Sequence, residues 1–309
     1  IKMNQGIYDK DLLLARVDFD RNKKPRLKLI EPETDRIYNF TPTFGEDITL
    51  EIATAQRFCI GWHDLTTGEE FACPERSEVE KKYEQCPRCQ KRTGFNPAFY
   101  NAAEGDISAQ QIERNQQPHF VYLAYFAENT IKVGISFAGR DIARLLEQGA
   151  RAALILDEFP SANVARNYEA KISAMPSFCE NVKSNAKIKL LEIKFDEVKA
   201  GQLLNEARDL IESNLNIRFT QNEVMFLDKF YSNQTIPHGE IIDTTKLESA
   251  NKITFSGKLL AQVGYILIAQ QQDENLVIPA RKFTGYKLKI SNKITEVELP
   301  ERQASLFDF

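Results

Sequence analysis

Four of the five cysteines in the chain have spacings that suit a metal site. Cys86 and Cys89 are two residues apart in Cys86-Pro87-Arg88-Cys89, a spacing that lets thiolates and backbone amides wrap a tetrahedral ion. Cys59 and Cys73 flank residues 62–71, which predict a β-hairpin whose two ends face each other across the strands. Four thiolates favour zinc over hard cations, so we expect a structural zinc site with no open coordination position. The alternative is four buried cysteines without an ion, and His63 is a substitute ligand or a residue of the hairpin surface.

Basic side chains surround the second cysteine pair, and aromatic residues follow it. The basic residues are Lys81, Lys82, Arg88, Lys91 and Arg92, and the aromatic residues are Phe95, Phe99 and Tyr100. Basic residues interleaved with aromatics suit contact with phosphates and stacking on bases. A solvated charged loop followed by aromatics packed into the next domain is the alternative reading.

The middle of the chain has the periodicity of a compact α/β unit. Apolar and alternating segments predict a hairpin, a helix that ends at Gly149, a third strand, and a helix that starts at Pro160-Ser161. The corresponding ranges are 120–127 and 131–136 for the hairpin, 141–148 for the first helix and 152–159 for the third strand.

That order of elements resembles the GIY-YIG nuclease domain. Tyr122 of Phe120-Val121-Tyr122 matches the tyrosine of the first motif, and Gly134 of Lys132-Val133-Gly134 matches the glycine of the second. Arg144 falls on the family's helix arginine, Gln148 falls where some members have a histidine, and Glu169 falls on its metal-binding glutamate. The chain as a whole also resembles an uncharacterised bacterial family, domain of unknown function 2797, that joins such a module to a cysteine cluster.

The GIY-YIG resemblance implies hydrolysis of a phosphodiester bond. Glu169 would hold one Mg²⁺ or Mn²⁺ ion, and Tyr122 would orient or deprotonate the attacking water. Arg144 would bind the phosphate, with Arg140 one turn earlier as a second candidate.

Two residues depart from the family pattern at positions where proton transfer is expected. Lys132 replaces a tyrosine, and it takes over the role of a phenol only if burial lowers its pKa. Gln148 replaces a proton acceptor. These departures are the reason for an alternative hypothesis, in which the module is not catalytic and binds DNA or RNA in the same cleft.

The flanking regions complete a multidomain α+β chain. Residues 1–58 predict an antiparallel β domain followed by a zinc-binding segment and linker over 59–117, and residues 118–235 form the GIY-YIG-like domain. Within that domain, residues 188–195 alternate like a strand, Asp196 caps a long helix, and Thr220 caps a shorter one. Residues 236–295 predict a small β-barrel of the OB or SH3 type, and a tail covers 296–309.

The tail contains a short peptide that could bind a partner. Gln303, Leu306 and Phe307 resemble the peptide with which bacterial replication and repair proteins bind the sliding clamp. Apolar anchors of this kind can carry most of the energy of a small interface. The alternative is that the apolar residues pack on the protein's own surface.

Composition limits the remaining possibilities. The net charge of −4 and the pI near 5.7 argue against bulk DNA packaging and leave room for a local nucleic-acid site. No signal sequence or membrane span is expected, and the odd number of cysteines with a tight pair indicates the reducing cytoplasm. The sequence therefore predicts a structure-selective DNA endonuclease of replication or repair; the alternatives are a DNA- or RNA-binding module or a zinc-stabilised adaptor.

Overall fold

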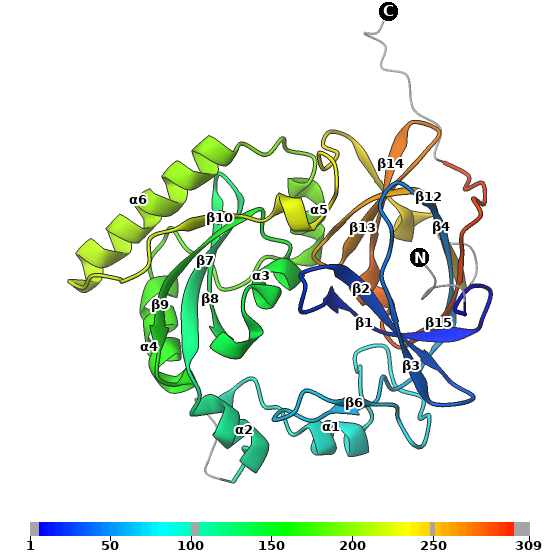
Figure 1. Cartoon of the computed structure of the whole chain (residues 1–309), viewed down its shortest axis with the longest axis horizontal. Coiled ribbons are helices and arrows are strands. Elements are labelled where there is room, and N and C mark those ends of the chain that lie inside the picture. Colours follow the sequence, from blue (N-terminus) through cyan, green and yellow to red (C-terminus); the bar gives the residue numbers. More distant parts are fainter. Residues whose placement is uncertain (1–5, 100–104, 248–250, 300–309) are drawn as a thin grey trace, which may run out of the picture.

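Two sheets, antiparallel apart from the pair of β11 and β14, dominate the computed structural model, which describes residues 6–99, 105–247 and 251–299 (Figure 1). One sheet has nine strands and the other has four, and a short hairpin lies apart from both. The expected α+β class is confirmed by these sheets and by the helices that pack beside them. None of the helices in these residues is long and apolar enough to cross a bilayer.

The nine-stranded sheet combines strands from both ends of the chain. Its order is β11-β14-β13-β12-β4-β15-β1-β2-β3. Its strands from the first part of the chain are β1 (Leu12–Phe19), β2 (Pro25–Glu31), β3 (Arg36–Phe40) and β4 (Asp47–Arg57). The others are β11 (Ile241–Asp243), β12 (Lys252–Val263), β13 (Ile266–Gln271), β14 (Glu274–Pro279) and β15 (Tyr286–Ser291).

The expected separate C-terminal barrel is wrong. Strand β4 pairs with β12 on one side and with β15 on the other, and β15 also pairs with β1. The long β4 buries most of its first half, and both of its edges are satisfied by strands from the other end of the chain. The β regions of residues 1–58 and 236–295 therefore share one sheet, while the other boundaries drawn from the sequence remain predictions.

The central module has the predicted order of hairpin, helix, strand and helix. The hairpin is β7 (His119–Ala127) and β8 (Thr130–Phe137), followed by α3 (Ala143–Gln148), β9 (Ala152–Phe159) and α4 (Ala162–Ser173). Gly149 ends α3 in the left-handed conformation, and the Ser161 side chain accepts a hydrogen bond from the backbone N–H of Val164 at the start of α4. These local signals are as the sequence predicts.

Two elements after α4 differ from the sequence-based prediction. The strand expected over residues 188–195 does not form. Residues 188–190 end a short helix, α5 (Ser184–Leu190), whose buried Ile188 joins the core of the nine-stranded sheet, and residues 191–195 lie outside helices and strands. The helix expected after Thr220 is instead β10 (Val224–Phe226), which pairs with β9 at the edge of the four-stranded sheet, and a 3₁₀ turn over Asp228–Phe230. The long helix α6 (Glu197–Leu215) is present and is capped by Asp196 as predicted.

The two faces of β7 belong to different cores. Val121, Leu123 and Tyr125 pack with α4 and α6. Phe120 and Tyr122 point to the opposite face and join the core of the nine-stranded sheet. Helix α3 lies between the two sheets in Figure 1, and its buried Leu145 and Leu146 join the core of the nine-stranded sheet.

The cysteine-rich segment lies below both sheets in the view of Figure 1. It contains the hairpin β5 (Trp62–His63) and β6 (Glu70–Phe71), then α1 (Pro87–Thr93), and α2 (Ala109–Asn115) leads on to the central module. Arg16 of β1 forms an ion pair with Glu70 at 3.1 Å. Arg114 of α2 donates a hydrogen bond to the Leu65 carbonyl and lies 4.4 Å from the centroid of the Phe137 ring in β8, so the segment contacts both halves of the molecule.

Candidate functional site

The four predicted metal ligands converge in the structure. The sulfur atoms of Cys59, Cys73, Cys86 and Cys89 all lie within 4.8 Å of one another, and all four side chains are buried. Sulfur atoms around one tetrahedral ion at Zn–S distances of ≈ 2.3 Å are separated by just under 4 Å, so the cluster has the dimensions of such a site. The cluster can hold a metal ion, and its all-sulfur donor set fits zinc.

Local structure brings these cysteines together. Cys59 and Cys73 flank the β5–β6 hairpin as predicted, and its turn is fixed by the Asp64 side chain, which accepts hydrogen bonds from the N–H groups of Thr66 and Thr67. Cys86 is the N-cap of α1, and Cys89 lies in the first turn of that helix. The N–H of Cys86 donates to Sγ of Cys59 at 3.2 Å, a contact that stabilises a thiolate.

Burial is the main cause of the raised pKa of two of these thiols. At a third thiol, hydrogen bonds outweigh burial and the pKa is lowered. Burial raises the pKa of Cys59 to about 11 and also raises the pKa of Cys89. At Cys86 burial is opposed by hydrogen bonds from Cys89, Cys59 and Ser77, which lower the pKa to about 7. Metal binding to this cluster would therefore release protons. His63 is not a member of the cluster, and burial lowers the pKa of its imidazole to about 4.

The predicted basic surface is exposed but partly neutralised. Lys81, Lys82, Arg88, Lys91 and Arg92 all lie on the surface. Arg88 forms an ion pair with Glu75, Lys82 pairs with Glu80 at 3.3 Å, and Arg92 lies over the Trp62 ring. Tyr83 and Phe95 are largely exposed in the same region, so cationic and aromatic surfaces occur together.

Tyr122 and Gly134 face each other across the β7–β8 hairpin. The Tyr122 ring is buried and occupies the space above Gly134, where an added Cβ would lie 2.5 Å from the phenol oxygen. Burial raises the pKa of Tyr122, and a hydrogen bond with Arg144 opposes that shift. Glu169 also raises this pKa, so Tyr122, Arg144 and Glu169 are electrostatic neighbours.

Helix α3 presents a connected set of polar side chains. The Gln148 side chain accepts from the Arg144 guanidinium, with N···O distances of 3.1 to 3.3 Å when its amide oxygen faces the arginine. Glu147 forms an ion pair with Arg140 and lies 3.9 Å from Arg144. Arg144 keeps 38 % of its side chain exposed, which leaves the guanidinium accessible to a ligand.

Lys132 lies on the same face of β8 as Gly134 and is buried. Its Nζ donates to the carbonyl oxygens of Val133 at 3.0 Å and Glu180 at 2.5 Å. Burial lowers the pKa of Lys132, Arg144 adds to the shift, and Glu169 opposes it. The burial on which a proton-transfer role for Lys132 depends is therefore present.

Glu169 is buried on α4 and forms an ion pair with Arg166, which also lies 3.3 Å from Glu180. The sequence left open whether Glu169 is a metal ligand or the partner of Arg166, and this geometry provides the ion pair. One buried carboxylate next to a substrate phosphate is also a donor set that Mg²⁺ accepts, because this ion keeps several water ligands.

Sequence reasoning missed Lys187, a buried lysine on α5 that lies in the electrostatic field of Lys132 and Arg144. Lys187 lies just before the segment 188–195 expected to be a strand, and the fold of α5 brings it beside Gln148. The predicted partner-binding residues Gln303, Leu306 and Phe307 lie outside the described residues.

The fold and the cluster define an α+β protein with two sheets and a segment whose four cysteines could hold a metal ion. Its family is identified by a sequence match over residues 45–288 to the family described as "Protein of unknown function (DUF2797)", and the chain belongs to that family. The match covers the cysteine cluster and the whole central module, and it ends in β15. No curated protein and no solved structure matches the chain.

Proposed function

We propose that the central module is the active site of a metal-dependent, structure-selective endonuclease that acts on DNA in replication or repair. The observation that carries this proposal is the convergence of Tyr122, Lys132, Arg144 and Glu169, which come from four different elements. Their order in the chain matches the motifs of the GIY-YIG nucleases. Two of them, Tyr122 and Lys132, are buried and have shifted pKa values, as catalytic groups often do.

In this proposal Arg144 binds the scissile phosphate, and Arg140 supports it from the preceding turn. The Arg144 guanidinium is partly exposed, and Gln148 fixes its direction. Two parallel N–H donors suit a phosphate, and a preorganised cation stabilises the charge that develops in the transition state.

Tyr122 orients the attacking water and does not deprotonate it. The raised pKa of Tyr122 means that the phenol keeps its proton at neutral pH. A protonated phenol can accept a hydrogen bond from water and hold it in line with the phosphate. Lys132, whose pKa is lowered, is the nearby group better suited to accept a proton.

Glu169 is the residue that would hold Mg²⁺ or Mn²⁺ in this site. When bound, the ion supplies charge neutralisation at the leaving oxygen. Arg166 directs the carboxylate of Glu169, and that ion pair must open or share the carboxylate for a metal to bind.

The cysteine cluster is proposed to hold structural zinc, and the basic residues beside it would contact the DNA backbone. The segment is attached to both sheets, so an ordered cluster fixes Arg88 and Lys91 relative to the central module. Recruitment by the sliding clamp through Gln303, Leu306 and Phe307 remains a prediction from the sequence.

A non-catalytic DNA- or RNA-binding module is the second candidate, and two contacts favour it. Glu169 is neutralised by Arg166, and Lys132 donates to two backbone carbonyls. Both contacts reduce the capacity for metal binding and proton transfer but leave Arg144 available for phosphate.

A cleavage assay separates these two functions. Purified protein is incubated with Mg²⁺ or Mn²⁺ and a panel of branched, flapped and duplex DNAs and matched RNAs. The nuclease proposal predicts nicking that is lost in Glu169→Gln and kept in Glu206→Gln, a control on the exposed face of α6. Salt-sensitive binding without cleavage, reduced by Arg144→Ala but not by Glu169→Gln, would identify the binding module.

A further inference from the structure

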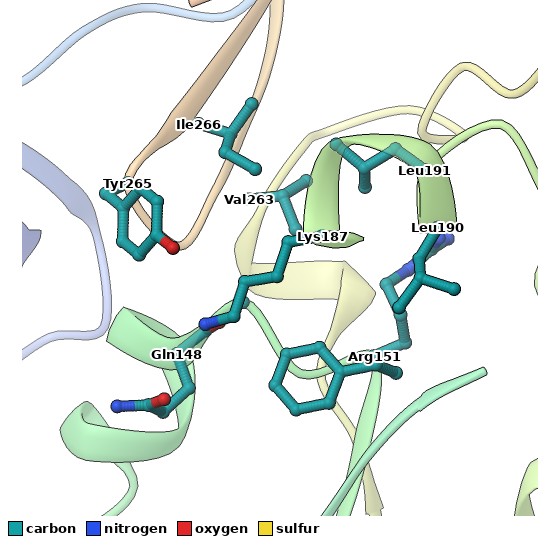
Figure 2. Close-up of a pocket in the computed structure, with 10 residues that line it drawn as sticks. Gln148, Arg151, Lys187, Leu190, Leu191, Val263, Tyr265 and Ile266 are labelled. Carbon is teal, nitrogen blue, oxygen red and sulfur yellow. The ribbon is translucent and has the colours of Figure 1, made fainter. Parts of the chain in front are cut away.

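Lys187 is held at the junction of the two sheets by contacts from both. Its Nζ donates to the backbone carbonyl of Gln148 at 2.6 Å. It lies 5.0 Å from the ring centroid of Phe126 in β7 and 5.1 Å from that of Tyr265 in the β12–β13 turn. Figure 2 shows the side chain reaching from α5 toward Gln148, with Tyr265 on the other side of the pocket.

The charged groups that face Lys187 are cations. Three cations repel its amine electrostatically: Lys132 of β8, Arg144 of α3 and Arg281 of the Ala280–Phe283 turn. The phenol of Tyr265 is hydrogen-bonded to Ser184 at 3.0 Å, and Arg151 in the same pocket is bound by Asp228. Within the described residues no carboxylate forms an ion pair with Lys187. Burial and these three cations lower the pKa of Lys187 to about 7.

This cluster has more positive than negative charge. Glu169 is matched by Arg166, and Glu147 is matched by Arg140. Glu180, the third nearby carboxylate, is also paired with Arg166, and Glu147 lies 3.9 Å from Arg144. In the part of the chain that the structure describes, Lys132 and Lys187 form no ion pair. A buried excess of positive charge is unfavourable in the free protein and becomes favourable when an anion binds.

Gln148 connects Lys187 to Arg144. Its backbone carbonyl accepts from Lys187, and its side-chain oxygen accepts from Arg144. The two cations are thus held by opposite ends of one residue, and a phosphate on Arg144 would lie in the field of Lys187.

We propose that Lys187 is a further phosphate-binding residue of this cleft and that it takes up a proton when the nucleic-acid backbone binds. The inference rests on the proposed function, because it places nucleic acid in the cleft. It adds a residue from α5, outside the motif set, and makes binding dependent on pH.

The sign of this dependence follows from linkage. A bound phosphate favours the charged amine, so the pKa of Lys187 is higher in the complex than the value of about 7 in the free protein. Affinity is therefore greatest below pH 7 and falls as the pH rises, by up to about tenfold per pH unit. An arginine keeps its charge at every pH of interest, so Lys187→Arg removes the dependence that Lys187 contributes.

The test measures binding of fluorescent single-stranded and branched DNA by anisotropy, without added divalent ions, from pH 6 to 8.5 at constant ionic strength. The full chain is compared with Lys187→Met, Lys187→Arg and Lys189→Met, an exposed control on the same helix. Lys187→Met is expected to lose about tenfold in affinity at pH 6.5, to lower the salt slope by about 1, and to flatten the pH profile relative to the parent chain. Lys189→Met should follow the parent profile.

The outcomes distinguish the inference from the function on which it rests. If the parent chain binds no DNA at any pH, the proposed function fails and the inference fails with it. If the parent chain binds but Lys187→Met keeps its affinity, salt slope and pH profile, the inference is overturned and the function stands. Lys187→Met removes a buried charge, so it should fold at least as stably as the parent, and thermal unfolding checks this.

Discussion

At the scale of residues, Gln148 shows how a departure from a family pattern can acquire a different role. A glutamine at this position cannot accept a proton as a histidine does, which argues against a simple copy of the nuclease mechanism. Its amide nevertheless fixes Arg144, and its backbone carbonyl fixes Lys187. Gln148 is therefore best described as a positioning residue of the proposed phosphate site.

The contact between Tyr122 and Gly134 gives a prediction at this scale. Gly134→Ala places a methyl group 2.5 Å from the Tyr122 oxygen and 2.6 Å from Cζ, so the ring must move. We expect a loss of about 1–3 kcal/mol in the free energy of unfolding, measured in urea, and a loss of any cleavage or binding that depends on Tyr122.

Gly201→Ala is the matched control for Gly134→Ala. Gly201 lies in α6, where an added Cβ meets nothing closer than 3.6 Å. Alanine is preferred to glycine in helices by about 1 kcal/mol, so this variant should be as stable as the parent chain or more stable. Equal stability of Gly134→Ala and the parent would contradict the described packing of Tyr122.

At the scale of elements, the β5–β6 hairpin and α1 are too short to hold themselves together. Each strand of the hairpin has two residues, and α1 has seven. The buried side chains in their shared core are the four cysteines, with Trp62 and Val79 packed against them. A metal ion would therefore supply the stability that a larger apolar core supplies elsewhere.

Metal removal tests this account of the cysteine segment. We expect about one zinc ion per chain by elemental analysis, lost in Cys89→Ser and kept in Cys179→Ser, which changes the cysteine outside the cluster. Loss of the ion should expose residues 59–93 to proteolysis and lower the melting temperature. Full metal retention in Cys89→Ser, or none in the parent chain, would refute a four-cysteine zinc site.

At the scale of the whole molecule, the nine-stranded sheet braces the central module. The turn between β12 and β13 lies against the end of α3, where Gly264 and Gly149 approach closely. The buried hydroxyl of Tyr231 donates to the Ala150 carbonyl at 2.7 Å, just beyond α3. The position of Arg144 and Gln148 thus depends on strands from the far end of the chain.

Gly264→Ala tests the bracing of α3. An added Cβ would lie 2.8 Å from the Gly149 nitrogen, and this backbone cannot yield as a flexible side chain does. We expect a loss of about 1–3 kcal/mol in unfolding free energy together with weaker DNA binding, measured by denaturation and anisotropy.

Gly68→Ala is the control for Gly264→Ala, because it adds backbone strain without a contact to α3. Gly68 has φ of +74° and Gly264 has φ of +62°, but nothing lies within 4 Å of a Cβ at Gly68. Alanine therefore strains the backbone by a similar amount at both positions. Only in Gly264→Ala does the added methyl group contact the end of α3. Equal effects of the two changes on DNA binding would show that the contact does not position α3.

The sequence by itself determined the local features of this protein. Alternating apolar residues and caps such as Ser161 and Asp196 specified the central hairpin and its helices, because these signals act over a few residues. The spacing of the cysteines likewise predicted a cluster that the structure brings together.

Tertiary structure alone decided the long-range features. The pairing of β4 with β12 and β15 joins segments about 200 residues apart, and no local pattern specifies a partner at that distance. The same applies to α5: residues 188–190 belong to a segment that alternates like a strand, yet they end a helix that brings Lys187 beside Gln148. The excess of positive charge around Arg144 exists only because these distant elements meet.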